Sequence, residues 1–490
     1  MMIKFTEHQI ILTADHSLMT EFREIALFGF LSCSPKQFMP EILYDHLFAP
    51  LVPSMNGEAK FAQYSLRKVE ATLLRDGYDV VVATPNHVEK FIGDSTEIIG
   101  LTVMDPLGIS PVTSFFRLVS NSIPYNHYKF LKLLKRIKGK SKIVVGGQGA
   151  WQFHEETTRE KYGIDHVLIG EFEKEGNNSF KSIIEGDAPP IIYMRSPTVD
   201  EIPSIRGASI NSLVEISRGC GRMCKFCSPT LAKKRDIPIE CIIEESKLNH
   251  EAGKSNSWLH AEDALLYGCH ASDFQPDRDA VLEMFKEVVS VEGINGAGFT
   301  HLSLAAVAAD PELIGGISSL CKTSPDHWTS VQPGIETGSP EVIRKGMANK
   351  VKPFQPDEWP DVVRDSIDIL NKNYWIPACT IIVGSPYESQ EDVQETIELV
   401  DSLEDKLCIL APLMYTDIGE EDETGLKNYK DLNPQEKELF YKCWRHSFKL
   451  FIDQADLAFK GFNPIMGTVL KNFVKLGSNV IIRRLDKDWG

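Results

Sequence analysis

Three cysteines lie close together and are the residues of this sequence best placed to do chemistry. Cys220, Cys224 and Cys227 have three and then two residues between them. Three thiolates at this spacing can wrap one face of an iron–sulfur cubane, and three ligands for four irons leave one iron open. A zinc site would want a fourth Cys or His at a finger-like offset, and none follows closely. A redox dithiol would not need the third cysteine.

The residues around the cysteines suit a cluster of this kind. Gly219 and Gly221 allow a tight backbone, and Phe226 can shield a cluster from water. Directly after an expected strand, and with an aromatic residue before the last cysteine, this motif resembles the radical S-adenosylmethionine (SAM) superfamily. The resemblance covers about residues 205–420. It implies a [4Fe-4S] cluster whose open iron binds SAM.

Further segments resemble the SAM contacts of this family. The segment His-Ala-Glu-Asp implies that Glu262 or Asp263 meets the amino group of SAM. A Gln-Pro-Gly-Ile-Glu-Thr-Gly block implies that Gln332 and Glu336 lie near its ribose and methionine, and a Val-Gly-Ser-Pro segment implies an adenine contact at Val383. Each has a structural alternative. Glu262 and Asp263 could cap a helix, and Glu336 could form a buried ion pair that only supports the fold.

The N-terminal part alternates apolar runs with amphipathic stretches, which predicts a parallel sheet covered by helices. Strands are expected at 79–83, 98–104, 143–146 and 166–169, and one helix from Phe116 to Val119 and on through His127 to Leu134. These elements predict a Rossmann-like domain over residues 1–190. Four prolines between Gly186 and Pro203 predict a linker after it.

A second alternating series predicts a partial barrel of parallel strands with helices outside. Its expected strands are 213–216, 257–260, 298–304, 327–331, 378–383 and 408–410. After Asp422, apolar residues recur at helical spacing. The predicted fold class is therefore α/β: a Rossmann-like domain (1–190), a partial (β/α)6 radical SAM barrel (205–420) and a small C-terminal helical domain (421–490).

A Rossmann-like domain ahead of such a barrel resembles the cobalamin-binding branch of the superfamily. Loops after three expected strands lie at the carboxyl edge of the sheet, where ligands of open parallel sheets bind. The resemblance implies cobalamin contacts at Met104, Asp105, Gly108, Thr113, Ser114, Gly146, Gly147, Gln148, Gly170 and Glu171. Thr113 and Ser114 could instead cap a helix starting at Phe115. The sequence departs from enzymes that use Asp-x-His-x-x-Gly, because Asp15-His16 has the wrong spacing, so the axial group stays open.

The composition of the whole chain restricts its partners and location. A formal net charge of −17 disfavours nucleic-acid binding, which normally needs a basic footprint. No apolar run approaches the roughly 20 residues of a membrane span, and the N-terminus lacks the layout of a signal peptide. We therefore expect a cytoplasmic protein.

The family resemblance implies a radical SAM methyltransferase that uses methylcobalamin to methylate an unactivated sp3 carbon. Similarity to archaeal members implies a peptide or protein substrate, such as a glutamine in the alpha subunit of methyl-coenzyme M reductase, the enzyme of methanogenesis. Ferredoxin or flavodoxin is the expected electron donor for this post-translational modification. Tyr267 and Tyr387 are expected in the substrate pocket, although aromatic residues at strand ends more often pack. Two alternatives are a radical enzyme that joins or cyclises carbons, for example in archaeal lipids, and a non-catalytic sensor.

Overall fold

The structure is a computed structural model that describes residues 7–24, 26–117, 122–227, 233–269, 272, 274–415, 432–454 and 464–489. The chain divides into two compact units. The first comprises residues 1–214 and 237–257, and the second comprises residues 215–236 and 258–490. The expected start of a C-terminal domain at residue 421 falls outside the described residues.

The first unit is built on a six-stranded sheet in the order β4-β1-β5-β6-β7-β8, in which all neighbours pair in parallel. The four expected strands are present and are β4 (Val80–Val82), β5 (Ile98–Thr102), β6 (Lys142–Gly146) and β7 (His166–Ile169). Two further strands were not predicted, the interior strand β1 (Ile10–Thr13), next to the edge strand β4, and the edge strand β8 (Ile191–Tyr193). The linker prediction is therefore wrong for β8, because prolines are tolerated just ahead of an edge strand.

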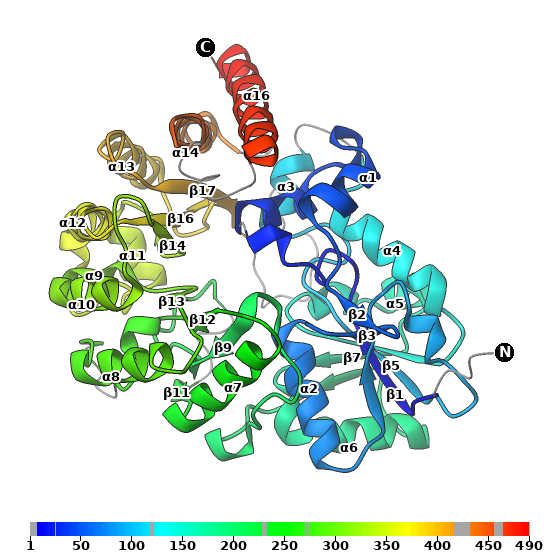
Figure 1. Ribbon diagram of the computed structural model, residues 1–490. Helices are drawn as coiled ribbons and strands as arrows, with labels where there is room; N and C mark the ends of the chain where they lie inside the picture. Colours follow the sequence, from blue (N-terminus) through cyan, green and yellow to red (C-terminus); the bar gives the residue numbers. More distant parts are fainter. Residues whose placement is uncertain are drawn as a thin grey trace. The chain divides into compact units, whose positions relative to one another are not determined.

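Helices cover both faces of this sheet (Figure 1). α2 (Tyr64–Arg75) and α6 (Phe172–Glu185) pack on one face, and α4 (Tyr125–Ile137) and α5 (Glu156–Tyr162) lie on the other. Successive residues of a strand point to opposite faces. Ile10 accordingly joins the core under α2 and α6, whereas Ile11 joins the core under α4. Both faces are buried, as expected for a parallel sheet.

The helix expected from Phe116 to Leu134 is not continuous. The structure has α3 (Pro111–Arg117) and, separately, α4, while residues 118–121 lie outside the described residues. Pro124 occupies the N-cap position of α4 in an extended conformation, which starts a new helix there. α3 begins at Pro111 and not at Phe115, because proline suits the first turn of a helix.

The expected barrel strands are present in two sheets. The first has the order β13-β12-β9, formed by β9 (Leu213–Glu215), β12 (Asn256–His260) and β13 (Gly296–Phe299). In the second, β14 (Thr329–Val331) and β15 (Gly334–Glu336) pair with successive parts of β16 (Trp375–Val383), which also pairs with β17 (Ile409–Met414). β13 ends earlier than predicted, because Ser303 caps a helix, α9 (Leu304–Ala309).

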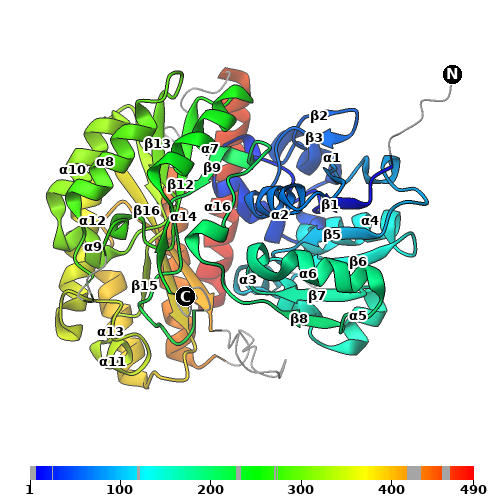
Figure 2. The ribbon, with the colours of Figure 1, turned by 90° about the horizontal axis from the view of Figure 1, so that it is seen from below.

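Helices alternate with these strands and lie outside them, which confirms the partial barrel (Figure 2). They are α8 (Arg278–Val289), α9, α10 (Pro311–Cys321), α11 (Pro340–Gly346), α12 (Trp359–Lys372) and α13 (Gln390–Asp401). The helical C-terminal part consists of α14 (Pro434–Asp453) and α16 (Pro464–Trp489). Ser447 of α14 donates to and accepts from the backbone of Leu410 in β17, both at 2.8 Å, so α14 packs on the last barrel strand.

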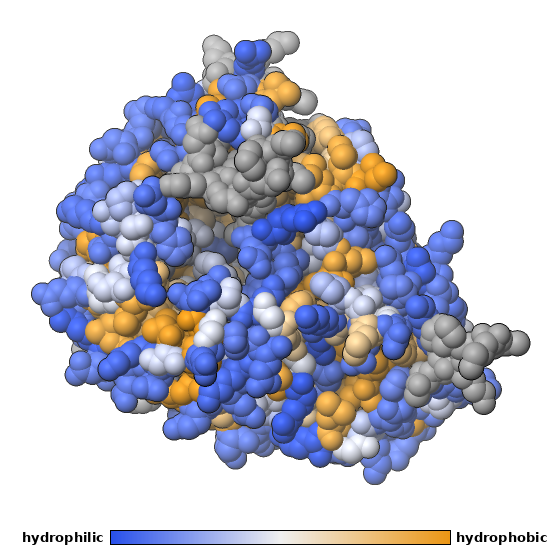
Figure 3. All heavy atoms as spheres, viewed as in Figure 1, coloured by the Kyte–Doolittle hydropathy of each residue, from blue (hydrophilic) through white to orange (hydrophobic). Residues whose placement is uncertain are grey.

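Hydrophilic residues cover most of the face seen in Figure 3, with apolar residues in scattered patches. None of the described helices is both long and apolar enough to cross a membrane.

Candidate functional site

The motif cysteines lie on a loop of the second unit. The loop leaves β10 (Ser217–Arg218), which pairs antiparallel with β11 (Arg235–Asp236). Gly219 and Gly221 have φ angles of 75° and 74°. Glycine adopts these angles without the steric cost that a Cβ imposes. The sequence prediction that both glycines serve the loop backbone agrees with this geometry.

The three thiols are free of disulfides. Burial raises the pKa of the Cys220 and Cys224 thiols, so both are protonated until a metal replaces the proton. Within the described residues, no three His, Cys, Asp or Glu side chains gather as closely as a single metal ion requires. A cubane uses a separate iron for each cysteine. Three soft thiols that form no disulfide lie on one glycine-containing loop and fit such a cluster.

Arg222 anchors the loop between the first two cysteines. Its guanidinium is buried, and Nη2 donates to Oδ2 of Asp263 at 3.1 Å and to Oγ of Ser303 at 3.0 Å. Nη1 donates to three backbone carbonyls, those of Asn349 (2.8 Å), Lys350 (3.1 Å) and Lys352 (3.2 Å). The loop is therefore held by one side chain at several points. Sequence reasoning missed Arg222, since nothing in the local pattern identifies its distant partners.

The two acidic residues after β12 differ in their surroundings. Asp263 accepts from Arg222 and, through Oδ1, from the Ser303 amide at 3.1 Å, and its side chain does not cap the short helix that follows. Glu262 is partly buried, and the pKa of its carboxyl is raised. Burial is the main cause, the charge of Glu215 adds to it, and His260 opposes it. Asp263 therefore supports the cysteine loop, whereas the contact of Glu262 with SAM stays a prediction.

Glu336 ends β15 in an unusual conformation with a φ of 66°. Its carboxylate accepts from Oγ1 of Thr380 at 3.1 Å and pairs with Nζ of Lys350 at 3.4 Å. Burial opposes the charge on Lys350, but Glu336 and Cys224 outweigh it, and the pKa of Lys350 is raised. The buried ion pair weighed from the sequence is thus present. It lies near the cysteine loop, because Cys224 influences Lys350 and the Lys350 carbonyl binds Arg222.

A pair of histidines at the ends of β12 and β13 escaped the sequence prediction. Oγ1 of Thr300 lies 2.8 Å from Nδ1 of His260 and 3.0 Å from Nδ1 of His301, and the two rings are 5.6 Å apart. Burial and the neighbouring His260 lower the pKa of His301 to about 4. His301 forms a parallel bridge with Gln332, which brings that predicted residue to the same strand ends. The sequence could have indicated both histidines, because each lies at or near the end of an expected strand.

The remaining predicted residues of the second unit have different surroundings. The carbonyl of Val383 accepts from the Tyr415 amide at 2.9 Å, so it serves the pairing of β16 and β17. Tyr267 is buried at the end of a short helix. Tyr387 lies close to the cysteine motif, because Nζ of Lys225 is 5.1 Å from its ring centroid.

In the first unit, Asp105 organises the loop after β5. Its Oδ1 accepts from the amides of Ile109 and Ser110, and its Oδ2 accepts from Thr113 Oγ1 at 2.5 Å and from Asn126 Nδ2 at 2.8 Å. Asp105 and Thr113 therefore support the loop from inside. Gly108, with a φ of 65°, packs against Pro124, and Ser114 of α3 donates to the carbonyl of Ile109, which precedes the helix.

Two exposed glycines follow strands at the carboxyl edge of the sheet. Gly147 and Gly170 follow β6 and β7 with φ angles of 94° and 115°, and both are exposed. A Cβ on Gly147 would lie 2.7 Å from Oγ1 of Thr102, so the fold itself requires glycine there. Gly146 and Glu171 are half-buried on either side of these turns, whereas Gln148 is exposed and Met104 is 57% exposed. The turns after β6 and β7 are therefore exposed at Gly147, Gln148 and Gly170.

Residues 214–400 match the sequence profile of the Radical SAM superfamily. This segment is a radical SAM domain. The match confirms the expected class of enzyme, and with it the [4Fe-4S] cluster and SAM as the cofactors that this superfamily implies. All three motif cysteines, Glu262, Glu336 and Val383 fall within the radical SAM domain.

Two curated relatives of the chain are named as methylthiotransferases or synthases of a methylthio product. The tRNA-2-methylthio-N(6)-dimethylallyladenosine synthase of Thermotoga petrophila is 25% identical over 329 residues, which cover 64% of this chain and 67% of that protein. The ribosomal protein uS12 methylthiotransferase RimO of Leptospira biflexa is 24% identical over 290 residues, which cover 56% of this chain and 58% of that protein. Neither similarity extends over the whole chain.

Two solved structures share the fold over nearly the whole chain. The radical SAM methyltransferase TsrM from Kitasatospora setae, solved with cobalamin and a [4Fe-4S] cluster, has a TM-score of 0.56 and 12% identity, covering 98% of this chain and 100% of that one. The cobalamin-dependent radical SAM enzyme OxsB, solved with aqua-cobalamin, has a TM-score of 0.54 and 12% identity, covering 98% and 72%. This likeness confirms the predicted fold class, including the sheet ahead of the radical SAM domain.

Proposed function

We propose that the chain is a cobalamin-dependent radical SAM C-methyltransferase that methylates an unactivated sp3 carbon. The observation that carries the proposal is the parallel sheet that precedes the radical SAM domain, with its exposed carboxyl edge at Gly147 and Gly170. Open parallel sheets bind ligands at this edge. TsrM and OxsB, whose solved structures contain cobalamin, support the assignment through their shared fold.

When bound, the cluster would supply the electron that cleaves SAM, and cobalamin would supply the methyl group. The residues of this chain bind and position these groups. Cys220, Cys224 and Cys227 would hold three irons on a loop fixed by Arg222. The Glu262 carboxylate would accept hydrogen bonds from the amino group of SAM. Tyr387, beside Lys225 of the cysteine motif, would line the space for substrate.

The proposed substrate is a carbon of a peptide or protein, such as a glutamine of the methyl-coenzyme M reductase alpha subunit, with ferredoxin or flavodoxin as electron donor. The net charge of −17 supports a protein over a tRNA, because polyanion binding requires a basic surface. A structure of TsrM was solved with tryptophan as its substrate, and an amino-acid substrate of that enzyme is compatible with this choice.

Methylthio transfer is a second candidate, favoured by the names of both curated relatives. The two reactions leave different products, since methylation adds one carbon whereas methylthiolation also adds sulfur. Joining or cyclising carbons is a third outcome, in which the product loses hydrogen.

The experiment that separates these functions uses SAM with a deuterated methyl group. The reconstituted, reduced enzyme is incubated with hydroxocobalamin and either a glutamine-containing peptide of the proposed substrate or total tRNA, and both are analysed by mass spectrometry. We expect the peptide to gain one labelled methyl group without sulfur, only when cobalamin is present. A sulfur-containing product, or label in tRNA alone, would replace the proposal with methylthio transfer.

Cobalamin binding has its own test at the sheet edge. Gln148→Trp places a bulky ring on the exposed edge and is expected to weaken hydroxocobalamin binding at least about tenfold, a loss of about 1.4 kcal/mol. Glu97→Trp is the matched control, because Glu97 is exposed just before β5, at the opposite edge of the same sheet. Equal binding by both variants would remove the edge from the proposal.

A further inference from the structure

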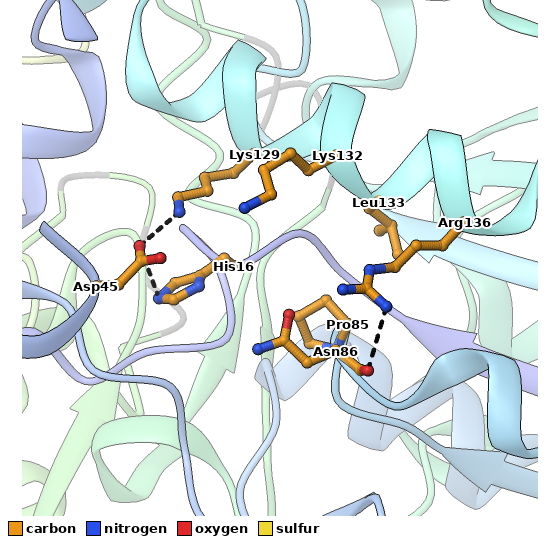
Figure 4. Close-up of a pocket in the computed structure, with 8 residues that line it drawn as sticks. All are labelled: His16, Asp45, Pro85, Asn86, Lys129, Lys132, Leu133 and Arg136. Carbon is orange, nitrogen blue, oxygen red and sulfur yellow. Dashed lines mark hydrogen bonds and ion pairs between the residues drawn. The ribbon is translucent and has the colours of Figure 1, made fainter. Parts of the chain in front are cut away.

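The cations that line the pocket of the first unit are all paired with carboxylates (Figure 4). Nζ of Lys129, for example, lies 2.5 Å from Oδ1 of Asp45. The pairs are Lys129 with Glu41 and Asp45, Lys132 with Glu41, and Arg136 with Glu89. The pocket therefore has no surplus charge for an anionic ligand. A polar atom without a partner lies instead in the second unit, on the ring of His260.

The ring of His260 faces the inside of the partial barrel. On the neighbouring β13, Phe299 packs against Phe285 of the outer helix α8, with ring centroids 5.3 Å apart. Successive residues of an extended chain point to opposite faces, so Thr300 faces the inside. Nδ1 of His260 lies 2.8 Å from Oγ1 of Thr300 and is therefore on the inside as well. His260 is half-buried, so a molecule inside the barrel can reach its ring.

A chain of hydrogen bonds determines where each histidine ring carries its hydrogen. Burial, together with the neighbouring His260, lowers the pKa of His301 to about 4, so this ring is neutral at pH 7 and has one hydrogen. The hydrogen bond to the Gln332 side chain acts to raise this pKa, which identifies His301 as its donor. Nδ1 of His301 lies 3.0 Å from Oγ1 of Thr300. The hydrogen given to Gln332 is therefore on Nε2, and Nδ1 accepts from the Thr300 hydroxyl.

The Thr300 hydroxyl has one hydrogen, and it gives this hydrogen to His301. Toward His260 the hydroxyl can only accept, so Nδ1 of His260 donates to it at 2.8 Å. In this form of the ring, Nε2 of His260 keeps its lone pair. Nε2 has no hydrogen bond to any residue that the structure describes. The inside of the barrel therefore presents an acceptor that lacks a donor.

The charges near this acceptor disfavour a carboxylate as its partner. Glu262, two residues after His260, is close enough to Glu215 for the charge of Glu215 to raise the pKa of the Glu262 carboxyl. Glu215 is paired with Arg218 at 2.8 Å, whereas Glu262 has no such pair among the described residues. A further negative charge would be repelled. A group that meets His260 should therefore carry an N–H or O–H and no negative charge.

We propose that Nε2 of His260 accepts a hydrogen bond from the side-chain amide of the substrate and so selects a carboxamide over a carboxylate. The proposal rests on the proposed function, because it assigns the substrate to the inside of the radical SAM barrel. A carboxamide meets both requirements, since it is neutral and its nitrogen donates. Thr300 and His301 are positioning residues that keep the hydrogen of His260 on Nδ1.

The test measures peptide binding to the full chain, with cluster and SAM but without reductant, so that no turnover occurs. Three labelled peptides of one sequence carry glutamine, glutamate γ-methyl ester or glutamate at the proposed position, and fluorescence anisotropy gives each Kd. The ester is neutral like the amide but has no N–H. We expect the glutamine peptide to bind at least about tenfold more tightly than either of the others. Equal binding of amide and ester, or no binding of any peptide, would overturn the proposal.

Variants of the relay separate a contact with substrate from a structural role. His260→Phe should bind the amide and ester peptides equally and still bind SAM like the unchanged enzyme. Thr300→Val keeps the shape of the side chain but removes the acceptor of Nδ1, and should lower the amide preference at least about threefold. A structural role would weaken all peptides together and leave their ratio unchanged. A preference retained in His260→Phe, or an equal loss of SAM binding, would overturn the proposal.

His327→Phe is the matched control, because His327 is exposed and lies before β14, whereas Gln332 follows that strand. It should keep the amide preference, and a loss equal to that of His260→Phe would overturn the proposal. Failure of the proposed function gives a different result. A preference that depends on His260, combined with a sulfur-containing product, would retain this contact and replace methyl transfer. Methylation of glutamine without any preference over the ester would retain the function and overturn the contact.

Discussion

Arg222 and Asp263 form a buried ion pair, with 3.1 Å between Nη2 and Oδ2 and side chains that are 4% and 3% exposed. The pair connects the cysteine loop to the end of β12. Removing one partner of such a pair leaves a buried charge uncompensated, which typically costs about 3–5 kcal/mol. The geometry of the cluster loop therefore depends on a carboxylate that family resemblance had placed against SAM.

Asp263→Asn should weaken the cysteine loop because it removes the negative charge opposite Arg222 while keeping the size of the side chain. We expect the variant to lose at least about 2 kcal/mol of stability and to retain less iron after anaerobic reconstitution. Iron and sulfide analysis, together with urea denaturation, measures both effects. Asp357→Asn is the control, since the Asp357–Arg344 pair is exposed and such pairs contribute about 0–1 kcal/mol. Normal iron content in Asp263→Asn would contradict the anchoring role.

The positive φ of Gly147 gives a second prediction. Gly147→Ala combines left-handed strain of about 1–2 kcal/mol with a Cβ too close to Thr102 Oγ1 and to the Val103 carbonyl. We expect a loss of stability of about 2–5 kcal/mol in urea denaturation. Gly139→Ala carries the same strain at a φ of 76° but meets no atom within 4 Å, and should lose about 1–2 kcal/mol. Equal losses in both variants would show that the turn after β6 does not pack as described.

Asp15 predicts a dependence of stability on pH. Burial raises the pKa of its carboxyl from an ordinary value of 3.8 to about 6, although hydrogen bonds from Ser17 act to lower it. The folded state binds the proton more tightly, so the stabilisation is fully present below about pH 4 and is lost as the pH rises through 6. At neutral pH the buried charge costs up to about 3 kcal/mol. Asp15→Asn, which can still accept from Ser17, should therefore be more stable than the unchanged protein at about pH 8 and no more stable at about pH 4. Urea midpoints that differ equally at both pH values would contradict this.

The cysteine motif and most strands of both sheets could be predicted because their signals are local in the chain. β6, which contains Val144, and β17 are short apolar runs between turn residues. The cysteine motif is defined by the spacing of its three thiols alone. The contacts of Arg222 could not be predicted, because its carbonyl partners lie 127 to 130 residues further along the chain. The same holds for Asp263, whose role is decided by Arg222 and not by its place after a strand. Asp105 and Thr113 likewise bind one another within the loop, which the resemblance alone did not indicate.

The most direct test of the radical SAM assignment is an anaerobic assay of SAM products. The unchanged enzyme, with cluster, reductant and hydroxocobalamin, should form both 5′-deoxyadenosine and S-adenosylhomocysteine when it methylates a substrate. Cys224→Ala should form neither and still bind hydroxocobalamin, whereas Cys321→Ala, which removes a buried thiol of α10 outside the motif, should form both. Formation of 5′-deoxyadenosine by Cys224→Ala at the rate of the unchanged enzyme would contradict the account.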